Sequence, residues 1–195
     1  SKIAEYEKVL NNLKNKQILI TAGPTWVPID DVRVISNIAT GETGILLAKE
    51  AARQGFKVTL FLGPVRDCCL DDSFKIIKFK FYDELRSRLR KELALRKYDY
   101  IIHSAAVSDF KPVHIFKGKV DSRKEVSLKL KPLPKIIRLI RHFAPWIKLV
   151  MFKLESGVSD SILMRRARIA QNKAGAELIV ANTLNPYRAF IIDKK

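Results

Sequence analysis

The sequence predicts an α/β protein with a doubly wound, Rossmann-like, mostly parallel sheet and helices on both faces. Short apolar runs that are typical of buried strands recur along the chain, as at 17–21 and 57–62. Segments with apolar side chains at helical spacing lie between these runs, as at 83–96. Strands that alternate with helices favour parallel sheets with right-handed crossovers. The 195 residues suit one domain, which we expect to span 1–195.

The N-terminal part is predicted to form a helix followed by a strand–helix–strand unit. The helix is expected over 2–16, where four apolar side chains lie near helical spacing: Ile3, Tyr6, Leu10 and Leu13. A buried strand at 17–21 leads into a Gly-Pro loop. Strong helix formers at 44–54 end at Gly55, and the run KVTLFL at 57–62 closes the unit as a second, parallel strand.

The middle of the chain continues the alternation. The run FKIIKFK at 74–80 predicts a strand, and DYIIH at 99–103 predicts another. Between them, the helix at 83–96 is predicted by three leucines at four-residue spacing: Leu85, Leu89 and Leu93.

The C-terminal part adds further strands and two helices. The segment 125–131 alternates strictly between polar and apolar residues, which predicts a half-exposed strand or hairpin arm. A helix is expected behind Pro134, because four apolar residues form a helical stripe there: Ile136, Leu139, Ile140 and Phe143. Strands are expected at 148–153 and 177–181, and the helix between them carries Leu163, Ala167, Ala170 and Ala174. A last strand is expected at 188–193.

Composition excludes several classes of protein. Hydrophobic residues make up 47% of the chain and Gly and Pro number eight each, which is typical of a globular domain and excludes a disordered or collagen-like chain. No apolar stretch approaches the roughly 18 residues of a membrane span, and the N-terminus lacks the apolar core of a signal peptide, so a cytoplasmic protein is expected. The two cysteines, Cys68 and Cys69, are adjacent, which excludes a disulfide scaffold and a multi-cysteine zinc site.

The net charge permits several partners without identifying one. The chain has 37 Lys and Arg against 20 Asp and Glu, which gives a formal charge of +17. Such an excess attracts nucleic acid, an anionic membrane surface or a phosphorylated small substrate, although many of these side chains can equally form a solvated face. No long basic run, zinc-finger spacing or RNA-recognition motif is present.

The first candidate site is the long loop predicted at 22–43. Ligands of open parallel sheets bind beyond the carboxyl ends of the strands. This loop ends in Asn37, Gly41 and Gly44 directly before a helix, where free amides favour a phosphate or carboxylate. The spacing matches neither the dinucleotide fingerprint nor the P-loop, so the glycines can equally shape a turn, and Asn37 can be a turn residue.

The second candidate site follows the strand at 99–103. Ala105 and Ala106 leave room for a flat ligand, and Asp109 can accept hydrogen bonds, although packing and turn capping explain them equally. The next stretch carries Gly118 and three lysines, Lys111, Lys117 and Lys119, which form either a phosphate-covering loop or a solvated one. His103 is expected to be a core residue, and no nucleophile elbow or H-E-x-x-H motif is present.

Taken together and in order, these segments resemble a known family. The stretches are ILITAGPTWVPIDDVRVISNIATGETG (18–44), HSAAVSDFKP (103–112), Lys119, LPKII (133–137), FKLES (152–156) and LIVAN (178–182). They resemble phosphopantothenate–cysteine ligase, in its stand-alone form, because no flavin-binding decarboxylase half precedes them. No flavin is therefore expected.

The resemblance implies an acid–amino-acid ligase of coenzyme A biosynthesis. Such an enzyme joins L-cysteine to 4′-phosphopantothenate through an acyl-nucleotidylate formed from CTP or ATP. It implies Mg²⁺ held mainly by the nucleotide phosphates. It also implies a homodimer whose partner subunit reaches over the active site, with no membrane or specific nucleic-acid partner.

The resemblance also assigns site residues. Asn37 and Lys119 match catalytic positions. Nucleotide-binding positions are matched by Gly41, Gly44, Ala105, Ala106, Asp109, Phe152 and Lys173. The chain departs from the family at Ala39, where a serine is usual, at Met151, where a glycine is frequent, and at Thr183, where an aspartate is usual.

Two other functions stay open on the residues alone. The alternating sheet pattern also suits a nicotinamide-dependent oxidoreductase, although its glycine fingerprint is missing. The +17 charge also suits a non-enzymatic nucleic-acid-binding protein.

Overall fold

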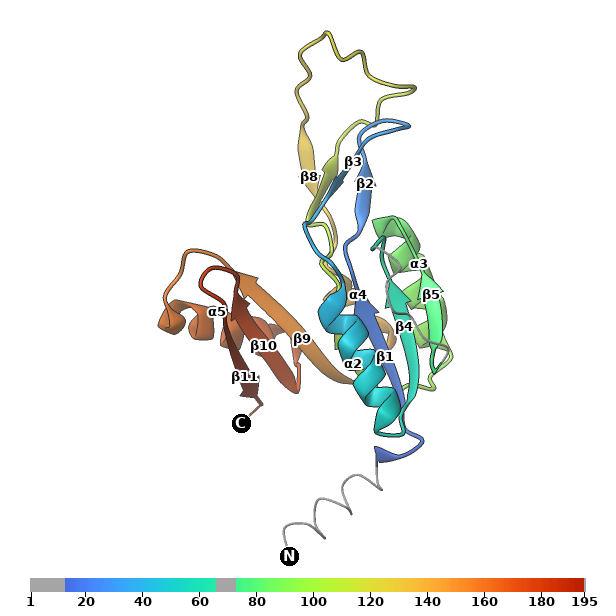
Figure 1. The fold of residues 1–195 in the computed structure, drawn as a ribbon, viewed down its shortest axis with the longest axis vertical. Coiled ribbons are helices and arrows are strands. Elements are labelled where there is room, and N and C mark those ends of the chain that lie inside the picture. Colours follow the sequence, from blue (N-terminus) through green and yellow to red (C-terminus); the bar gives the residue numbers. More distant parts are fainter. Residues whose placement is uncertain (1–12, 66–72, 195) are drawn as a thin grey trace, which may run out of the picture.

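A seven-stranded sheet forms the centre of the molecule (Figure 1). The computed structural model describes residues 13–65 and 73–194. The strands lie in the order β11-β10-β9-β6-β1-β4-β5, and all pairs are parallel except β10 with β11. In chain order they are β1 (Gln17–Ala22), β4 (Lys57–Leu62), β5 (Lys75–Lys78), β6 (Tyr100–His103), β9 (Lys148–Glu155), β10 (Leu178–Thr183) and β11 (Arg188–Asp193). The predicted mostly parallel, Rossmann-like sheet is confirmed.

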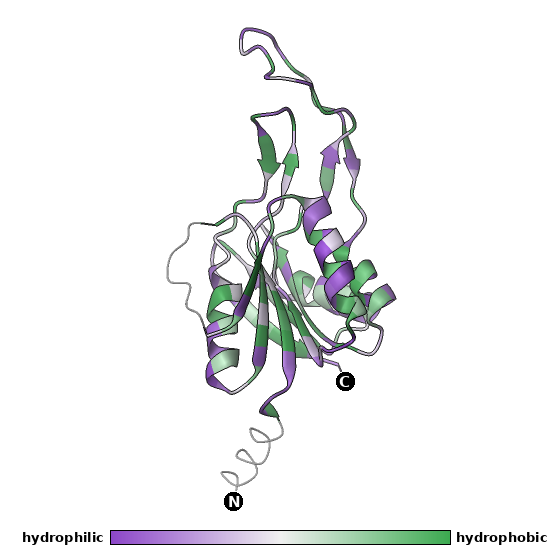
Figure 2. Ribbon diagram, turned by 90° about the vertical axis from the view of Figure 1, so that its right-hand side faces the viewer, coloured by the Kyte–Doolittle hydropathy of each residue, from purple (hydrophilic) through white to green (hydrophobic). Residues whose placement is uncertain are grey.

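Helices cover both faces of the sheet, as predicted. They are α2 (Glu42–Arg53), α3 (Tyr82–Ala94), α4 (Ile136–Phe143) and α5 (Asp160–Ala174). Helix α2 packs on β1 and β4, whereas α3, α4 and α5 pack side by side on the opposite face. Successive side chains of a strand point to opposite faces, so Leu19 and Ile101 face α3 and α4, and Ile20 and Leu60 face α2. In Figure 2 the central strands are mostly hydrophobic, while the helices mix hydrophobic and hydrophilic turns.

Two short hairpins project from the sheet and are drawn above it in Figures 1 and 2. Strands β2 (Trp26–Pro28) and β3 (Val34–Ser36) form one antiparallel pair, and β7 (Phe110–Pro112) and β8 (Leu130–Pro132) form the other. We call these four strands, with their connections 29–33 and 113–129, the arm. It joins the body beside the carboxyl ends of β1 and β6.

Most predicted elements agree with the structure to within a few residues, and the differences concentrate in the arm. The predicted loop at 22–43 contains β2 and β3. The predicted strand at 125–131 is wrong over most of its length, because only Leu130–Pro132 pairs, with the three-residue strand β7. The predicted helix at 2–16 and the cysteine pair 68–69 lie outside the described residues, apart from 13–16.

The chain order of the strands creates a switch point between β1 and β6. From β1 the chain proceeds to β4 and β5 on one side, and later to β6, β9, β10 and β11 on the other. Ligands of such sheets bind beyond the carboxyl ends of the strands at the switch point. The loops after β1 and β6 run side by side there, joined by a bridge between Pro24 and Ala106, and we call the region beyond these strand ends, next to the N-terminus of α2, the crevice. No helix in the described part of the chain is both long and apolar enough to cross a membrane.

Candidate functional site at the strand ends

Three glycines bring main-chain segments close together at the base of the candidate site. Gly23 follows β1, Gly63 follows β4, and Gly41 is the N-cap of α2. A Cβ on Gly41 would lie 3.2 Å from the Cα of Gly23, and a Cβ on Gly63 would lie 2.2 Å from the Pro24 oxygen. Gly23 and Gly41 also have positive φ values of 79° and 74°, which side chains rarely allow. The three segments therefore approach one another more closely than any side chain permits.

Gly44 serves helix packing. A Cβ there would lie 2.4 Å from the Ala22 Cβ and 2.8 Å from the Ser104 Oγ. The residue is thus small because α2 lies directly on β1. The structure accounts for Gly44 by packing and for Gly41 by its left-handed cap, and neither requires a ligand.

The N-terminus of α2 faces the crevice with few internal partners. Gly41 offers no side-chain oxygen to cap the helix, and the Glu42 amide donates to the Thr40 Oγ1 at 3.3 Å. The uncapped first turn carries a partial positive charge, which stabilises an anion placed there. The Thr40 hydroxyl therefore lies beside the amides that a phosphate would use.

The loop after β6 is held against β1 by a network centred on Thr21. The Thr21 Oγ1 lies 2.8 Å from the His103 Nδ1 and accepts a 3.3 Å hydrogen bond from the Ala105 amide. The Ala106 amide donates to the Gly23 oxygen at 2.9 Å. Burial lowers the pKa of His103 to about 4, so the imidazole is neutral at pH 7 and helps to position the loop through its contact with Thr21.

Asn37 joins the two loops that flank the crevice. Its Nδ2 donates to the oxygens of Ala106 at 3.0 Å and Val107 at 3.2 Å. Both amide hydrogens are therefore used within the protein, and only the Oδ1 is left to accept a hydrogen bond. The structure thus brings Asn37 together with Ala106, and places Gly41 at the end of the same loop and Gly44 in the first turn of α2.

Asp109 lies at the edge of this group and is paired with a residue of the next segment. The Lys135 Nζ lies 2.5 Å from the Asp109 Oδ1, and both side chains are more than half exposed. The Leu133 amide also donates to the main-chain oxygen of Asp109, which ties the segment before α4 to the loop after β6. Lys135, which the sequence did not single out, is therefore a neighbour of the candidate site.

Lys119 lies on the arm rather than in the crevice. The amides on either side of it, of Gly118 and Val120, donate to the carboxylates of Asp31 and Asp30 at 3.0 Å. Hydrogen bonds from Val120 and from the Val32 and Arg33 amides, together with the Arg33 guanidinium, lower the pKa of Asp30 to about 2 despite its burial. Asp30 therefore orients the segment that carries Lys119, a role the sequence did not predict.

The last two predicted residues occupy different ends of the sheet. Phe152 lies on β9, one residue beyond the position paired with His103, and points to the α2 face like Val150. Lys173 lies in the last turn of α5, which leads through Gly175 into the amino end of β10. The structure therefore places Phe152 within β9 and Lys173 near the amino end of the neighbouring strand β10, away from the loops after β1 and β6.

The arrangement suits the binding of anions more than acid–base chemistry. It offers uncapped helix amides, main-chain groups of the β6 loop and the Asn37 oxygen around one crevice. The one histidine in it is neutral. Among residues 13–65 and 73–194, no three His, Cys, Asp or Glu side chains gather as a protein metal site requires.

Several known proteins have sequences similar to this chain. The chain is 34% identical to the coenzyme A biosynthesis bifunctional protein CoaBC of Thermococcus kodakarensis over 198 residues, covering 96% of this chain and 48% of that protein. It is 36% identical to the CoaBC of Methanocaldococcus jannaschii, covering 94% of this chain and 45% of that protein. The chain thus spans about half the length of these relatives.

Solved structures share the fold. The DNA/pantothenate metabolism flavoprotein from Streptococcus pneumoniae superposes with a TM-score of 0.83 at 29% identity, covering 92% of this chain and 90% of that one. A mutant of Cab2 in complex with phosphopantothenate-cysteine has a TM-score of 0.76 at 19% identity, covering 99% and 84%, a likeness that shows the fold alone.

The family profile decides the assignment. The profile described as the DNA/pantothenate metabolism flavoprotein C-terminal domain matches residues 13–195, which is nearly the whole chain. Both candidate loops and the arm lie within this match. The chain therefore belongs to the family of DNA/pantothenate metabolism flavoprotein C-terminal domains.

Proposed function

We propose that this domain joins L-cysteine to 4′-phosphopantothenate with CTP or ATP, as a phosphopantothenate–cysteine ligase of coenzyme A biosynthesis. The curated relatives are named for coenzyme A biosynthesis, and the Cab2 structure is described with phosphopantothenate-cysteine. One observation carries the proposal to this chain. The Asn37 amide joins the loop before α2 to the loop after β6 across the switch point.

The proposed reaction has two steps that need little acid–base help. A carboxylate oxygen of 4′-phosphopantothenate attacks the α-phosphorus of the nucleotide, and pyrophosphate leaves. The cysteine amine then attacks the acyl carbon, the bond to the nucleotide oxygen breaks, the nucleoside monophosphate leaves, and the nitrogen gives up a proton to water. Both steps bring anions together, so positioned donors and positive charge supply the catalysis.

Different groups of the crevice are proposed to contact different parts of the substrates. The uncapped amides of α2 and the Thr40 hydroxyl receive phosphate oxygens. The 104–107 backbone and Phe152 line the nucleoside, and the Asn37 Oδ1 accepts from the acyl intermediate. The helix amides cannot ligate a metal, so a magnesium ion would be held mainly by the phosphates themselves and would neutralise their charge when bound.

In the proposed homodimer, Lys119 of one subunit reaches the crevice of the other subunit. It lies on the connection of the arm, which projects away from its own sheet in Figure 1. Several apolar side chains of the arm are exposed: Val32, Val34, Phe110, Ile115, Phe116 and Leu130. We propose that these side chains pack against a second copy and that the arm of one subunit places Lys119 over the crevice of the other.

The test is nucleotide-dependent release of pyrophosphate. The protein is mixed with 4′-phosphopantothenate, L-cysteine, Mg²⁺ and either CTP or ATP, and pyrophosphate and loss of thiol are measured. Wild-type protein should release pyrophosphate only with the acid substrate present, because the carboxylate is the nucleophile.

Asn37→Asp and a matched control sharpen the test. Asn37→Asp removes both donors to Ala106 and Val107 and adds a negative charge beside the phosphates, so the rate should fall by about a hundredfold. Asn172→Asp makes the same change on the exposed face of α5, at the other edge of the sheet, and should leave the rate within about twofold. Absence of pyrophosphate with both nucleotides would overturn the proposed function.

A further inference from the structure

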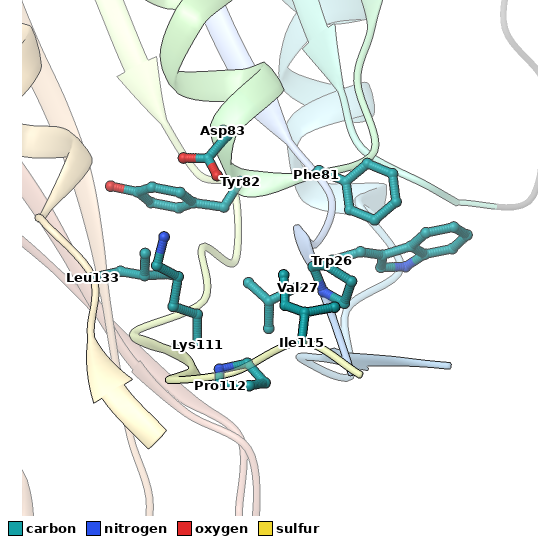
Figure 3. Close-up of a pocket in the computed structure, with 10 residues that line it drawn as sticks. Trp26, Val27, Phe81, Tyr82, Asp83, Lys111, Pro112, Ile115 and Leu133 are labelled. Atoms are coloured by element: carbon teal, nitrogen blue, oxygen red, sulfur yellow. The ribbon is translucent and has the colours of Figure 1, made fainter. Parts of the chain in front are cut away.

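A separate pocket lies where the arm meets α3 (Figure 3). It has a volume of about 210 Å³. Strand β2, the start of α3, strand β7 and the segment before α4 all contribute walls. Because it lies on the α3 side of the arm, it is distinct from the crevice between the loops after β1 and β6.

One side of the pocket is aromatic and apolar. The Trp26 and Phe81 rings lie 6.1 Å apart in an edge-to-face arrangement, with an interplanar angle of 75°. Val27 lies beneath them and Ile115 closes the rim. Aromatic rings prefer such partners, so this side suits a flat apolar group.

The other side carries two charges of opposite sign. In Figure 3 the Lys111 ammonium and the Asp83 carboxylate lie near the Tyr82 ring, across from Trp26 and Phe81. Within residues 13–65 and 73–194 neither side chain makes an ion pair or a hydrogen bond. The Tyr82 hydroxyl, by contrast, donates to the Pro134 oxygen at 2.5 Å and is already used.

These features favour a ligand that carries both charges. A simple anion would be attracted by Lys111 but repelled by the Asp83 carboxylate. A simple cation would be attracted by Asp83 but repelled by Lys111. An α-amino acid presents a carboxylate and an ammonium on one carbon, and its side chain can extend toward the opposite wall. Charge-assisted hydrogen bonds to both groups are the strong kind.

We propose that this pocket binds a free α-amino acid with an aromatic or large apolar side chain. The carboxylate pairs with Lys111, the ammonium pairs with Asp83, and the side chain packs between Trp26, Phe81 and Val27. Because the pocket is built from both the arm and α3, an occupied pocket fixes the arm that carries Lys119. The binding claim is independent of the proposed ligase activity.

Binding to this pocket can be measured by the fluorescence emission of Trp26. The chain has two tryptophans, and the other, Trp146, stacks on Arg96 at 4.2 Å. Trp146→Phe keeps an aromatic partner for that arginine and leaves Trp26 as the single reporter. L-Phenylalanine should change the Trp26 emission saturably in this variant.

A set of related probes separates the two charges. 3-Phenylpropionate lacks the ammonium, phenethylamine lacks the carboxylate, and L-alanine keeps both but lacks the ring. Each should bind about tenfold more weakly than L-phenylalanine, as expected for the loss of one charge-assisted contact or of one aromatic group. Equal binding of 3-phenylpropionate and L-phenylalanine would overturn the role of Asp83.

Variants test the same contacts from the protein side. Lys111→Met and Asp83→Asn, each in the Trp146→Phe background, should each weaken L-phenylalanine binding about tenfold. Lys124→Met and Glu125→Gln are the matched controls, because both residues are exposed on the arm and neither lines the pocket. An absence of saturable change with every probe, or equal binding by Lys111→Met and Lys124→Met, would overturn the proposal.

Discussion

Asp30 controls the local structure of the arm through one buried carboxylate. Its Oδ1 accepts from the Val32 and Arg33 amides at 2.8 and 2.6 Å, and its Oδ2 accepts from the Val120 amide and the Arg33 guanidinium. The sequence contains Asp30 within the ID…VR segment, but nothing in it shows that residue 120 is the partner. The contact spans 90 positions, and only the fold brings its ends together.

The pH at which Asp30 gains a proton is a direct test of this network. The pKa is lowered to about 2, so the carboxylate stabilises the folded state above its ordinary value near 3.8 and loses this effect as the pH falls toward 2. The amide resonance of Val120 should therefore shift with a midpoint near pH 2 in an NMR titration. A midpoint near 4 would show that the Val120 hydrogen bond is not formed.

Removal of the Asp30 charge should impair the proposed reaction. In Asp30→Asn the side-chain NH₂ group would face two other hydrogen-bond donors, the Val120 amide and the Arg33 guanidinium. The hydrogen bonds that hold the segment around Lys119 would then be lost. We expect turnover to fall by about tenfold or more, as misplacement of a catalytic group does. Asp121→Asn, which breaks a surface pair with Arg123 on the same connection, should have little effect in the same assay.

His103 should make stability depend on pH. Burial lowers its pKa to about 4, so the unfolded chain takes up a proton first, and folded stability falls as the pH drops below about 6.5. Between pH 7 and 4.5 this contribution is about 2 kcal/mol. Urea unfolding should be measured at pH 7 and at pH 4.5. The free energy of unfolding should fall less between these pH values in His103→Asn than in the wild type, because an uncharged amide still faces the Thr21 hydroxyl. An equal loss in both proteins would contradict this assignment.

At the scale of elements, the contact between α2 and β1 limits which residues can replace Gly44. Alanine is the better helix former by about 1 kcal/mol. Its methyl group, however, would lie 2.4 Å from the Ala22 Cβ, and overpacking of this kind typically costs about 1–3 kcal/mol. Gly44→Ala should therefore lower the free energy of unfolding by about 1 kcal/mol, measured by chemical denaturation. A gain in stability would show that α2 can move away from the sheet.

The main strands could be predicted from sequence, while the arm could not. Buried parallel strands give continuous apolar runs, as at 57–62, which match β4 residue for residue. The strands of the arm are three residues long and contain Pro28, Pro112 and Pro132, so they carry almost no periodicity. The alternation at 125–131 predicts a longer strand, but β7 offers only three residues for pairing.

At the scale of the whole molecule, the arm should govern assembly. If its exposed apolar side chains meet a second copy, analytical ultracentrifugation should show a dimer, and the paired change Val34→Asp with Phe116→Asp should give a monomer. Ile191→Asp is the matched control, because Ile191 is 75% exposed on the edge strand β11, away from the arm. A monomeric wild-type protein, or a dimer unchanged by the paired substitution, would contradict the proposed arrangement.

The sequence predicted which loops lie at the switch point, but not where every candidate residue lies. Asn37 and Ala106 meet because the loops after β1 and β6 leave the sheet at one switch point, which the alternation of strands already implies. Lys119 and Lys173 lie away from these residues, because the tertiary structure places their segments elsewhere. Residue 119 lies on a hairpin connection held by Asp30, and residue 173 lies in the last turn of α5, near the amino end of β10.

The glycine contacts beneath the crevice also limit which substitutions the chain tolerates. Gly23 lies against main-chain atoms of both Gly41 and Gly63, so a side chain at Gly63 requires the Gly23–Pro24 segment to move, and one at Gly41 requires Gly23 or Val65 to move. Single substitutions at these glycines should therefore disturb two segments at once. Changes in ligand preference are expected instead from side chains such as Phe152.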